Sequence, residues 1–211
     1  MKVAVRKRRP RDAEATRREI LDAAESLFAA QGYGSTSLAE IAASSNTHKS
    51  LILHHFKSKG SLWQLVKERR FSSFVDEQKV LFSRGAVSLD EIRKATKAYF
   101  ELLKNDPVLL QLLTRAELEQ DLTCSQYDEK RLAPFVARMR DAQQSKLLRA
   151  DVPPAHLLLI IINVITQWFE ARAVFRDWSE LGGEDPDASF LDSLNRVFFE
   201  GALARSSEER N

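Results

Sequence analysis

Residues 37–59, with the sequence SLAEIAASSNTHKSLILHHFKSK, constrain the fold most, because they predict two short helices joined by a sharp turn. Ser37 and Glu40 have the spacing of a capping box, in which a serine caps the first helical turn and a glutamate bonds back to the serine amide. Polar residues at 44–47 then interrupt the helical pattern. Asn46 among them tolerates the left-handed conformation that a sharp helix exit requires. We therefore predict a helical corner here.

A second helix is predicted from His48 to Phe56, with an apolar and a polar side. Leu51, Ile52 and Phe56 are available to pack inward. The polar face consists of Thr47, His48, Lys49, Ser50 and His54. Two short helices, of which the second is rich in hydrogen-bond donors, form the arrangement that offers a helix to the major groove of DNA. The alternative is an ordinary helical corner, since helical hairpins have no intrinsic function.

The positive charge of the chain is concentrated near this corner. Residues 1–60 carry 11 basic and 6 acidic side chains, whereas the remainder carries 21 basic and 24 acidic ones. Most of the excess lies in the opening segment KVAVRKRRPR, which has too few apolar residues to fold by itself. Clustered arginines suit contact with DNA phosphates. A solubilising tail is the alternative interpretation.

The composition favours a cytoplasmic protein. Cys124 is the single cysteine, which excludes an intrachain disulfide and fits a reducing compartment. The basic start is not followed by the apolar segment of a signal peptide. The most apolar run, at 157–169, is shorter than the roughly 20 residues needed to span a bilayer and contains Asn163 and Gln167. We expect it to be a buried helix and expect no membrane partner.

The rest of the chain predicts further helices and no strand, so the fold class is all-α with about nine helices. The predicted helices run from Thr16 to Gly32, from Ser58 to about Phe82, from Ser88 to about Lys104, from Pro107 over a leucine-rich segment, from Tyr127 to Leu148, from Ala155 to Phe175 and from Pro186 to Ala204. Further capping boxes are predicted at Thr16 with Glu19 and at Ser88 with Glu91, and further caps at Ser58 and Asp106. The domains expected are a basic arm at 1–15, a helix-turn-helix domain at 16–60 and a larger helical domain at 61–211.

The last two helices are predicted to form a homodimer interface. The helix at 155–175 is apolar around most of its circumference, which is more than burial inside one small helical layer requires. Two copies of the pair suit a four-helix bundle around a twofold axis. Two reading helices would then fit half-sites one or more DNA turns apart, at roughly 34–36 Å per turn. The predicted interface residues are Leu158, Ile161, Ile165, Trp168, Phe190, Leu194, Val197 and Phe198.

The segment from Thr16 to Val66 resembles the DNA-binding domain of the TetR family of bacterial transcriptional regulators. The matching positions are Ile20, Ala24, Phe28, Gly32, Thr36, Ile41, Ala42, His55, Phe56, Lys59 and Leu62. The resemblance implies an all-α homodimer with three N-terminal helices for DNA and a C-terminal domain for effector binding and dimerisation. It implies a repressor of a palindromic operator, although the family also contains activators.

The resemblance also implies roles for single residues. The implied DNA contacts are Thr36 or Ser37 to phosphate, Thr47, His48, Lys49 and Ser50 in the groove, and Lys59 to phosphate, with His54 on the same face. Three positions depart from the family pattern. Asn46 replaces a turn glycine, His48 replaces a serine so that Thr47 is the alternative cap, and Leu53 replaces a tyrosine that binds phosphate.

An effector pocket for an unidentified small molecule is expected inside the C-terminal helices. The candidate lining residues are Phe74, Tyr99, Phe100, Leu103, Leu110, Glu117, Phe135 and Trp168. The alternative is that most of them are ordinary core, because an aromatic stripe at helical spacing usually packs inside a domain.

Two other function classes remain open. The histidines and Cys124 lack the paired spacing of zinc ligands, so we expect neither a metal nor a cofactor. The sequence contains no glycine-rich phosphate loop, nucleophile elbow or paired-carboxylate motif, so we do not expect an enzyme. A helical adaptor that binds protein is the main alternative, and salt-dependent binding to duplex DNA would distinguish it from a regulator.

Overall fold

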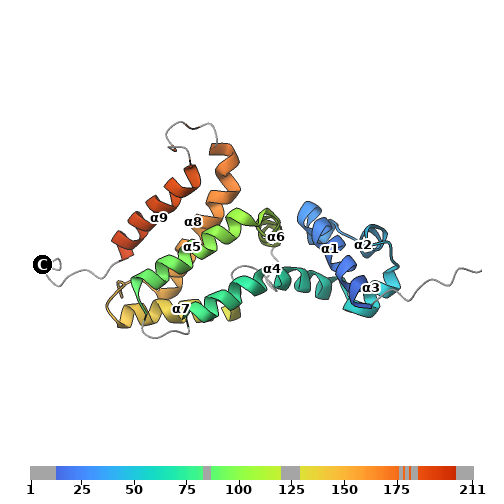
Figure 1. Cartoon of the computed structure of the whole chain (residues 1–211), viewed down its shortest axis with the longest axis horizontal. Coiled ribbons are helices and arrows are strands. Elements are labelled where there is room, and N and C mark those ends of the chain that lie inside the picture. Colours follow the sequence, from blue (N-terminus) through green and yellow to red (C-terminus); the bar gives the residue numbers. More distant parts are fainter. Residues whose placement is uncertain are drawn as a thin grey trace, which may run out of the picture. The chain divides into compact units, whose positions relative to one another are not determined.

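The computed structural model describes residues 13–82, 87–119, 129–175, 178, 181 and 185–202, with the backbone alone at 71–82, 130–131 and 202. These residues form nine α-helices and no strand, which confirms the predicted all-α fold (Figure 1). The helices are α1 (Ala13–Ser35), α2 (Leu38–Ser44), α3 (Lys49–Phe56), α4 (Lys59–Phe82), α5 (Leu89–Asn105), α6 (Pro107–Leu118), α7 (Glu129–Gln144), α8 (Pro154–Phe175) and α9 (Pro186–Ala202).

The described chain forms two compact units. The first contains α1, α2, α3, the part of α4 up to Arg70 and the part of α6 from Gln111. The second contains the remaining parts of α4 and α6 together with α5, α7, α8 and α9. The units therefore divide inside α4 and α6, whereas the boundary between the two helical domains is predicted after residue 60.

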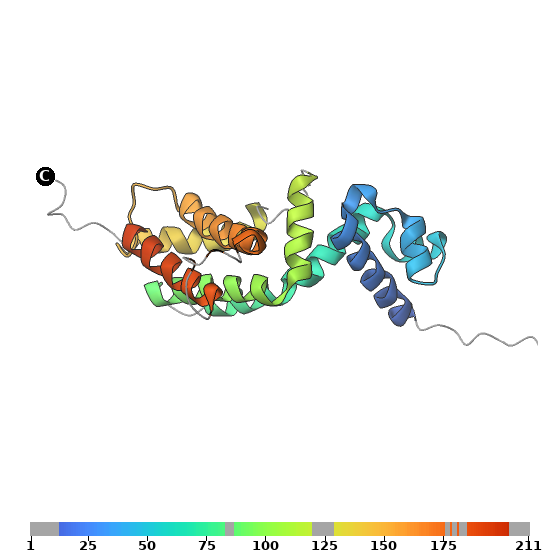
Figure 2. The same cartoon turned by 90° about the horizontal axis from the view of Figure 1, so that it is seen from above.

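The first unit is built around an aromatic centre. Phe28 of α1 packs edge-on against Trp63 of α4 with ring centroids 5.0 Å apart, and Tyr33 lies 6.0 Å from each ring. The core also takes in one isoleucine from each of the first three helices, namely Ile20, Ile41 and Ile52. The helix α2 contacts both α1 and α3, and the three lie together in both views (Figures 1 and 2). This packing holds the two short helices, which are too short to be stable alone.

Local capping signals determine where several helices begin. The Glu40 amide donates to Ser37 Oγ at 3.2 Å, and the Ser37 amide donates to Glu40 Oε2 at 2.7 Å, so the predicted capping box is confirmed. Ser58 and Asp106 each accept a hydrogen bond from the backbone amide three residues later, as predicted. The first helical turns of α2, α4 and α6 are thus stabilised by side chains next to them in the sequence.

The other two predicted capping boxes differ in the structure. The helix α1 begins at Ala13, so Thr16 lies buried inside the helix and the prediction that it caps the helix is wrong. Ser88 does cap α5, but the Glu91 side chain turns to Arg138 of α7 instead of to the Ser88 amide. The Arg138 Nη2 atom donates to both Glu91 carboxylate oxygens, at 2.6 and 2.8 Å. A tertiary ion pair has taken the place of the local contact.

The second unit is a helical bundle in which α8 packs against α5 and α7, and α9 packs against α5 (Figure 2). The 22-residue helix α8 is long and apolar enough to cross a membrane by length and composition alone. Its buried residues, however, lie within the bundle, as in a core helix; they are Leu157, Leu158, Ile161, Ile162, Ile165, Thr166, Trp168 and Phe169.

Candidate nucleic-acid interface

The turn between α2 and α3 sets the direction of the second helix. Asn46 adopts a positive φ of 49°, which confirms the expected left-handed residue. The Asn46 amide donates to the Ala43 carbonyl at 3.2 Å, and the Thr47 amide donates to the Ala42 carbonyl at 2.8 Å. This pair of bonds is the Schellman motif, which closes a helix with a left-handed residue at its end. Asparagine therefore replaces glycine here without loss of the turn.

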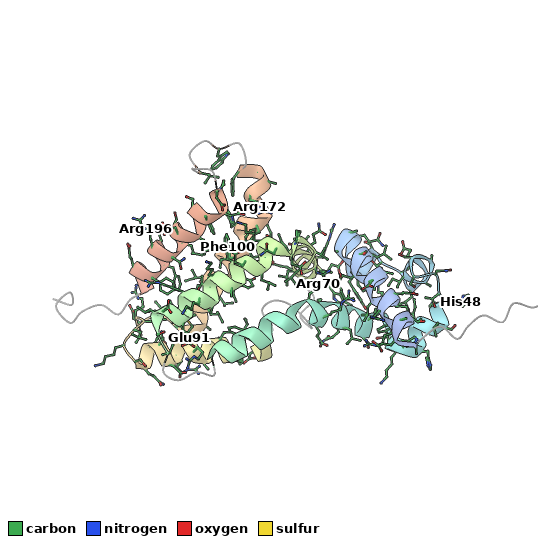
Figure 3. The ribbon with its side chains drawn as sticks, in the orientation of Figure 1. His48, Arg70, Glu91, Phe100, Arg172 and Arg196 are labelled. Carbon is green, nitrogen blue, oxygen red and sulfur yellow. The ribbon has the colours of Figure 1, made fainter. Side chains whose placement is uncertain are left out.

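The helix α3 separates its side chains into a buried and an exposed face. Ile52 and Phe56 are 1 % and 2 % exposed and pack into the first unit. The residues that are expected to face DNA from α3 and its cap are exposed, and so is Leu53. They are His48, Lys49, Ser50 and His54. Figure 3 shows His48 at the α3 end of this unit. The arrangement presents one continuous outward face to a partner.

The start of α3 has no side-chain cap. His48 is the N-cap residue, and its side chain makes no capping hydrogen bond. The Thr47 hydroxyl is buried and has no hydrogen-bond partner among the described residues, so the expectation that Thr47 caps the helix is wrong. The first amides of α3 therefore remain available to an external acceptor, because a helix leaves its first N–H groups without internal partners.

The two candidate phosphate contacts at the start of α2 lie in different environments. Thr36 is 1 % exposed, and its hydroxyl donates to the Gly32 carbonyl at 2.7 Å. Ser37 is exposed, and its hydroxyl oxygen caps α2. Because Thr36 is satisfied inside the unit, Ser37 is the member of the pair that lies at the surface.

Lys59 ties the start of α4 to the end of α1. Its Nζ atom donates to the carbonyls of Tyr33 and Thr36 at 2.8 and 2.9 Å and lies 4.2 Å from the centre of the Tyr33 ring. An ammonium group has three N–H donors, so two are engaged within the unit. The phosphate contact of Lys59 remains a prediction that depends on the third.

The α1–α2 corner is also held by the end of α6 and by the residue that follows it, in contacts that the sequence did not predict. The Glu119 carboxylate accepts hydrogen bonds from the amides of Tyr33 and Gly34, at 3.1 and 3.0 Å. Arg115 donates to the Ala30 carbonyl at 3.0 Å. Gly32, between these contacts, has φ 84° and ψ 171°, a conformation that is essentially restricted to glycine. The two glycines of the Gly32-Tyr33-Gly34 segment are the local sequence signal that another segment packs closely against the backbone here.

Two arginines of α4 bind carboxylates of α1. Arg69 donates to Asp22 at 2.7 Å and to Glu25 at 2.6 Å, and Arg70, which is labelled in Figure 3, also bonds Glu25. Burial acts to raise the pKa of Glu25, but the hydrogen bonds and charges of Arg70 and Arg69 outweigh it and hold this pKa below its ordinary value. The ion pairs thus fix α4 against α1.

Several predicted effector-pocket residues share the core of the second unit. Tyr99, Phe100 and Leu103 lie on the buried face of α5. The Tyr99 hydroxyl lies 3.0 Å from Thr166 Oγ1, and both groups are buried. Phe100 packs against Phe169 with ring centroids 4.8 Å apart. This core therefore combines aromatic surface with one buried hydroxyl pair.

The other predicted pocket residues are more dispersed. Trp168 stacks on Phe190 of α9 with ring centroids 4.2 Å apart, and its indole N–H donates to Asp187 at 2.9 Å. Leu110 and Phe135 are half-buried, Glu117 is exposed and belongs to the first unit, and the side chain of Phe74 lies outside the described residues. The tryptophan thus joins α8 to α9 within one chain.

Most of the predicted dimer-interface residues are buried inside one chain. Those at most 9 % exposed are Leu158, Ile161, Ile165, Trp168, Leu194 and Phe198. Phe190 is half-buried and Val197 is 75 % exposed. The exposed large apolar side chains near the middle of α8 are Ile160 and Val164, at 46 % and 38 %. They lie one helical turn apart on the outer side of the helix, whereas the predicted α8 residues are buried within the single chain.

The fold and the outward face of α3 define a helix-turn-helix DNA-binding transcriptional regulator. The sequence model described as bacterial regulatory proteins, tetR family, matches residues 20–66, and the one described as tetracyclin repressor-like, C-terminal domain, matches residues 92–188. The chain therefore belongs to the TetR family.

The chain is also similar to known proteins over nearly its whole length. The chain is 26 % identical over 190 residues to the transcriptional repressor SCO4008 of Streptomyces coelicolor. The aligned region covers 89 % of this chain and 95 % of the repressor. The structure of SCO4942 from Streptomyces coelicolor is similar with a TM-score of 0.70 at 20 % identity, covering 90 % of this chain and 99 % of that one. A gamma-butyrolactone receptor has a TM-score of 0.59 at 23 % identity, covering 90 % and 99 %.

Proposed function

We propose that this protein is a cytoplasmic, ligand-responsive repressor that binds a palindromic operator as a homodimer. The observation that carries the proposal is the exposed face of α3, which is held by the Schellman turn on one side and by buried Ile52 and Phe56 on the other. A helix positioned in this way by a helix-turn-helix domain reads the major groove. The similarity to the repressor SCO4008 supports repression in place of activation.

Binding to DNA is tested with a fluorescent duplex from immediately upstream of the coding region, at two salt concentrations and against a shuffled duplex. Specific binding that weakens with salt is expected, because protein cations displace counterions from phosphates. Equal binding to both duplexes would place the operator elsewhere. No binding even at low salt would overturn the proposal and favour the helical adaptor.

A matched pair of variants locates the contact surface. Lys49→Ala removes an exposed charge from α3 and is expected to lower specific affinity by about tenfold. Lys94→Ala removes an exposed charge from α5 and is expected to leave affinity unchanged. Equal effects of both variants would mean that net charge and not the α3 face determines binding.

The dimer proposal rests on the exposed apolar side chains of the last two helices. Ile160 and Val164 on α8 and Val197 on α9 are exposed in the single chain. Burying such side chains against a second copy removes apolar surface from water. An interface on α8 and α9 would relate the α3 helices of the two protomers by a twofold axis.

The effector proposal rests on the core around α5 and α8. Its aromatic surface and the Tyr99–Thr166 hydroxyl pair suit an apolar small molecule with one polar group. The similarity to a gamma-butyrolactone receptor supports a small-molecule effector in general terms. Because α4 and α6 contribute residues to both units, they are the helices through which effector binding would reach the reading head. The test is a screen of small molecules for compounds that bind the protein. We expect an effector to raise the thermal midpoint of the protein and to release the operator duplex.

A further inference from the structure

Leu53 is an apolar side chain in the middle of an otherwise polar surface. It is 38 % exposed, whereas its neighbour Ile52 is 1 % exposed. Leu53 follows Lys49 by four residues and Ser50 by three, so the three side chains share one face of α3. His54 next to it is exposed as well. The leucine therefore belongs to the face that we propose to enter the groove.

The chemistry of the major groove limits what such a side chain recognises. Leucine has neither a donor nor an acceptor, so it forms no hydrogen bond with phosphates or with the polar edges of bases. Among the groups that base pairs present in the major groove, the C5-methyl of thymine is apolar. Contact between the two removes both from water, whereas a polar base edge opposite the leucine would lose its hydrogen bonds to water.

We propose that Leu53 is a specificity-determining residue that recognises the methyl group of one thymine in each operator half-site. The inference rests on the proposed role of α3 as the reading helix. The neighbouring Lys49, Ser50 and His54 supply the donors for polar edges and phosphates, and Leu53 adds discrimination in favour of thymine at a single position.

The test replaces each thymine of the bound operator in turn by 2′-deoxyuridine, which removes the methyl group and leaves the hydrogen-bonding edges unchanged. For the wild type we expect one position per half-site at which affinity falls by about fourfold, the effect of losing one buried methyl-sized contact. Leu53→Ala is expected to bind the thymine operator more weakly and to show no further loss at that position. Leu53→Met, which conserves apolar volume, is expected to retain the methyl dependence.

Two controls separate this role from general effects. Lys49→Ala is expected to weaken binding while the uridine penalty at the Leu53 position persists. Leu118→Ala alters a leucine of α6 that is 71 % exposed and is expected to bind as the wild type. A uridine penalty that Leu53→Ala leaves intact at every position, or a wild type that binds specifically without any uridine penalty, would overturn this inference alone. Absence of specific binding by the wild type would overturn the proposed function as well.

Discussion

Glu119 and Gly34 are joined by a 3.0 Å hydrogen bond although 85 positions separate them in the sequence. The same carboxylate accepts a hydrogen bond from the Tyr33 amide, so one acidic side chain directly after α6 satisfies two successive backbone donors at the end of α1. Lys59 holds the carbonyl side of this segment from α4. The corner between α1 and α2 is therefore anchored by two side chains of opposite charge. The Glu119 carboxylate binds its backbone amides, and the Lys59 ammonium group binds its backbone carbonyls.

Replacing Glu119 is expected to destabilise the corner. Glu119→Ala removes two charge-assisted hydrogen bonds at an exposed site, so we expect a loss of about 1 kcal/mol in the free energy of unfolding. Such a loss lowers Tm by roughly 2–4 °C in a chain of this size. Glu117→Ala, two residues away and exposed, is the control and should leave Tm unchanged. Equal Tm values for the two variants would show that the Glu119 contacts contribute nothing.

Gly32 is expected to tolerate no side chain. A Cβ atom there would lie 2.3 Å from Glu119 Oε1, and the φ of 84° is unfavourable for any other residue. Gly32→Ala should cost about 1–3 kcal/mol in chemical denaturation, for the backbone conformation alone. Gly201→Ala, with nothing within 4 Å, is the matched control and should be neutral or slightly stabilising. Adding Glu119→Ala to Gly32→Ala should cost less than the sum of the single changes, because the collision is relieved.

The local features of this domain could be predicted from the sequence, whereas its long-range contacts could not. The capping box of Ser37 and the left-handed Asn46 depend on residues adjacent in sequence, and the structure confirms both. The Glu119 and Lys59 contacts join distant segments, and no spacing rule identifies their partners. Glu91 illustrates the competition, since its carboxylate pairs with the half-buried Arg138 of α7 and not with the amide of Ser88 beside it.

Which side chains of α8 are exposed could not be predicted from the sequence for a different reason. A helix that is apolar on most sides has no periodicity that separates core from interface. Ile160 and Ile161 are chemically identical neighbours, yet one is 46 % and the other 4 % exposed. The tertiary packing of α5 and α7 decides which of them is left at the surface.

Stability is expected to fall in acid because of Glu25. The folded-state pKa of Glu25 lies below its ordinary value of 4.5, so the unfolded chain binds more protons in that window and stability rises with pH there. The contribution is complete above about pH 5 and is lost as the pH falls through the folded-state pKa. Glu25→Gln should reduce the slope of the unfolding free energy against pH below about pH 5. Glu68→Gln, on an exposed glutamate of α4, should leave the wild-type slope.

Lys59 is expected to stabilise the fold whether or not it also binds DNA. Lys59→Ala leaves the Tyr33 and Thr36 carbonyls without their donor, and we expect a loss of about 1–2 kcal/mol in urea denaturation, since hydrogen bonds to a charged group are stronger than neutral ones. Lys57→Ala, which removes an exposed charge two residues earlier, is the control. If the third N–H of Lys59 also binds phosphate, Lys59→Ala lowers the salt slope of operator binding by about 0.9 for each protomer, or about 1.8 for the dimer. An unchanged slope would restrict Lys59 to its structural role.

The dimer interface is tested best at residues that are exposed in the single chain. Val197→Glu places a charge on α9 at a side chain that is 75 % exposed, so the protomer should fold normally while the charge would be buried between two copies. We expect a monomer at micromolar concentration by sedimentation. We also expect an operator affinity lowered by at least about tenfold, because the two DNA-binding units of a dimer bind together.

Phe198→Glu does not isolate the interface, because Phe198 is 8 % exposed and packs on Phe199 within the chain. Val174→Glu, on an α8 side chain that is 73 % exposed near the helix end, maps how far the interface extends. A dimer that survives both Val197→Glu and Ile160→Glu would place the interface away from these two helices.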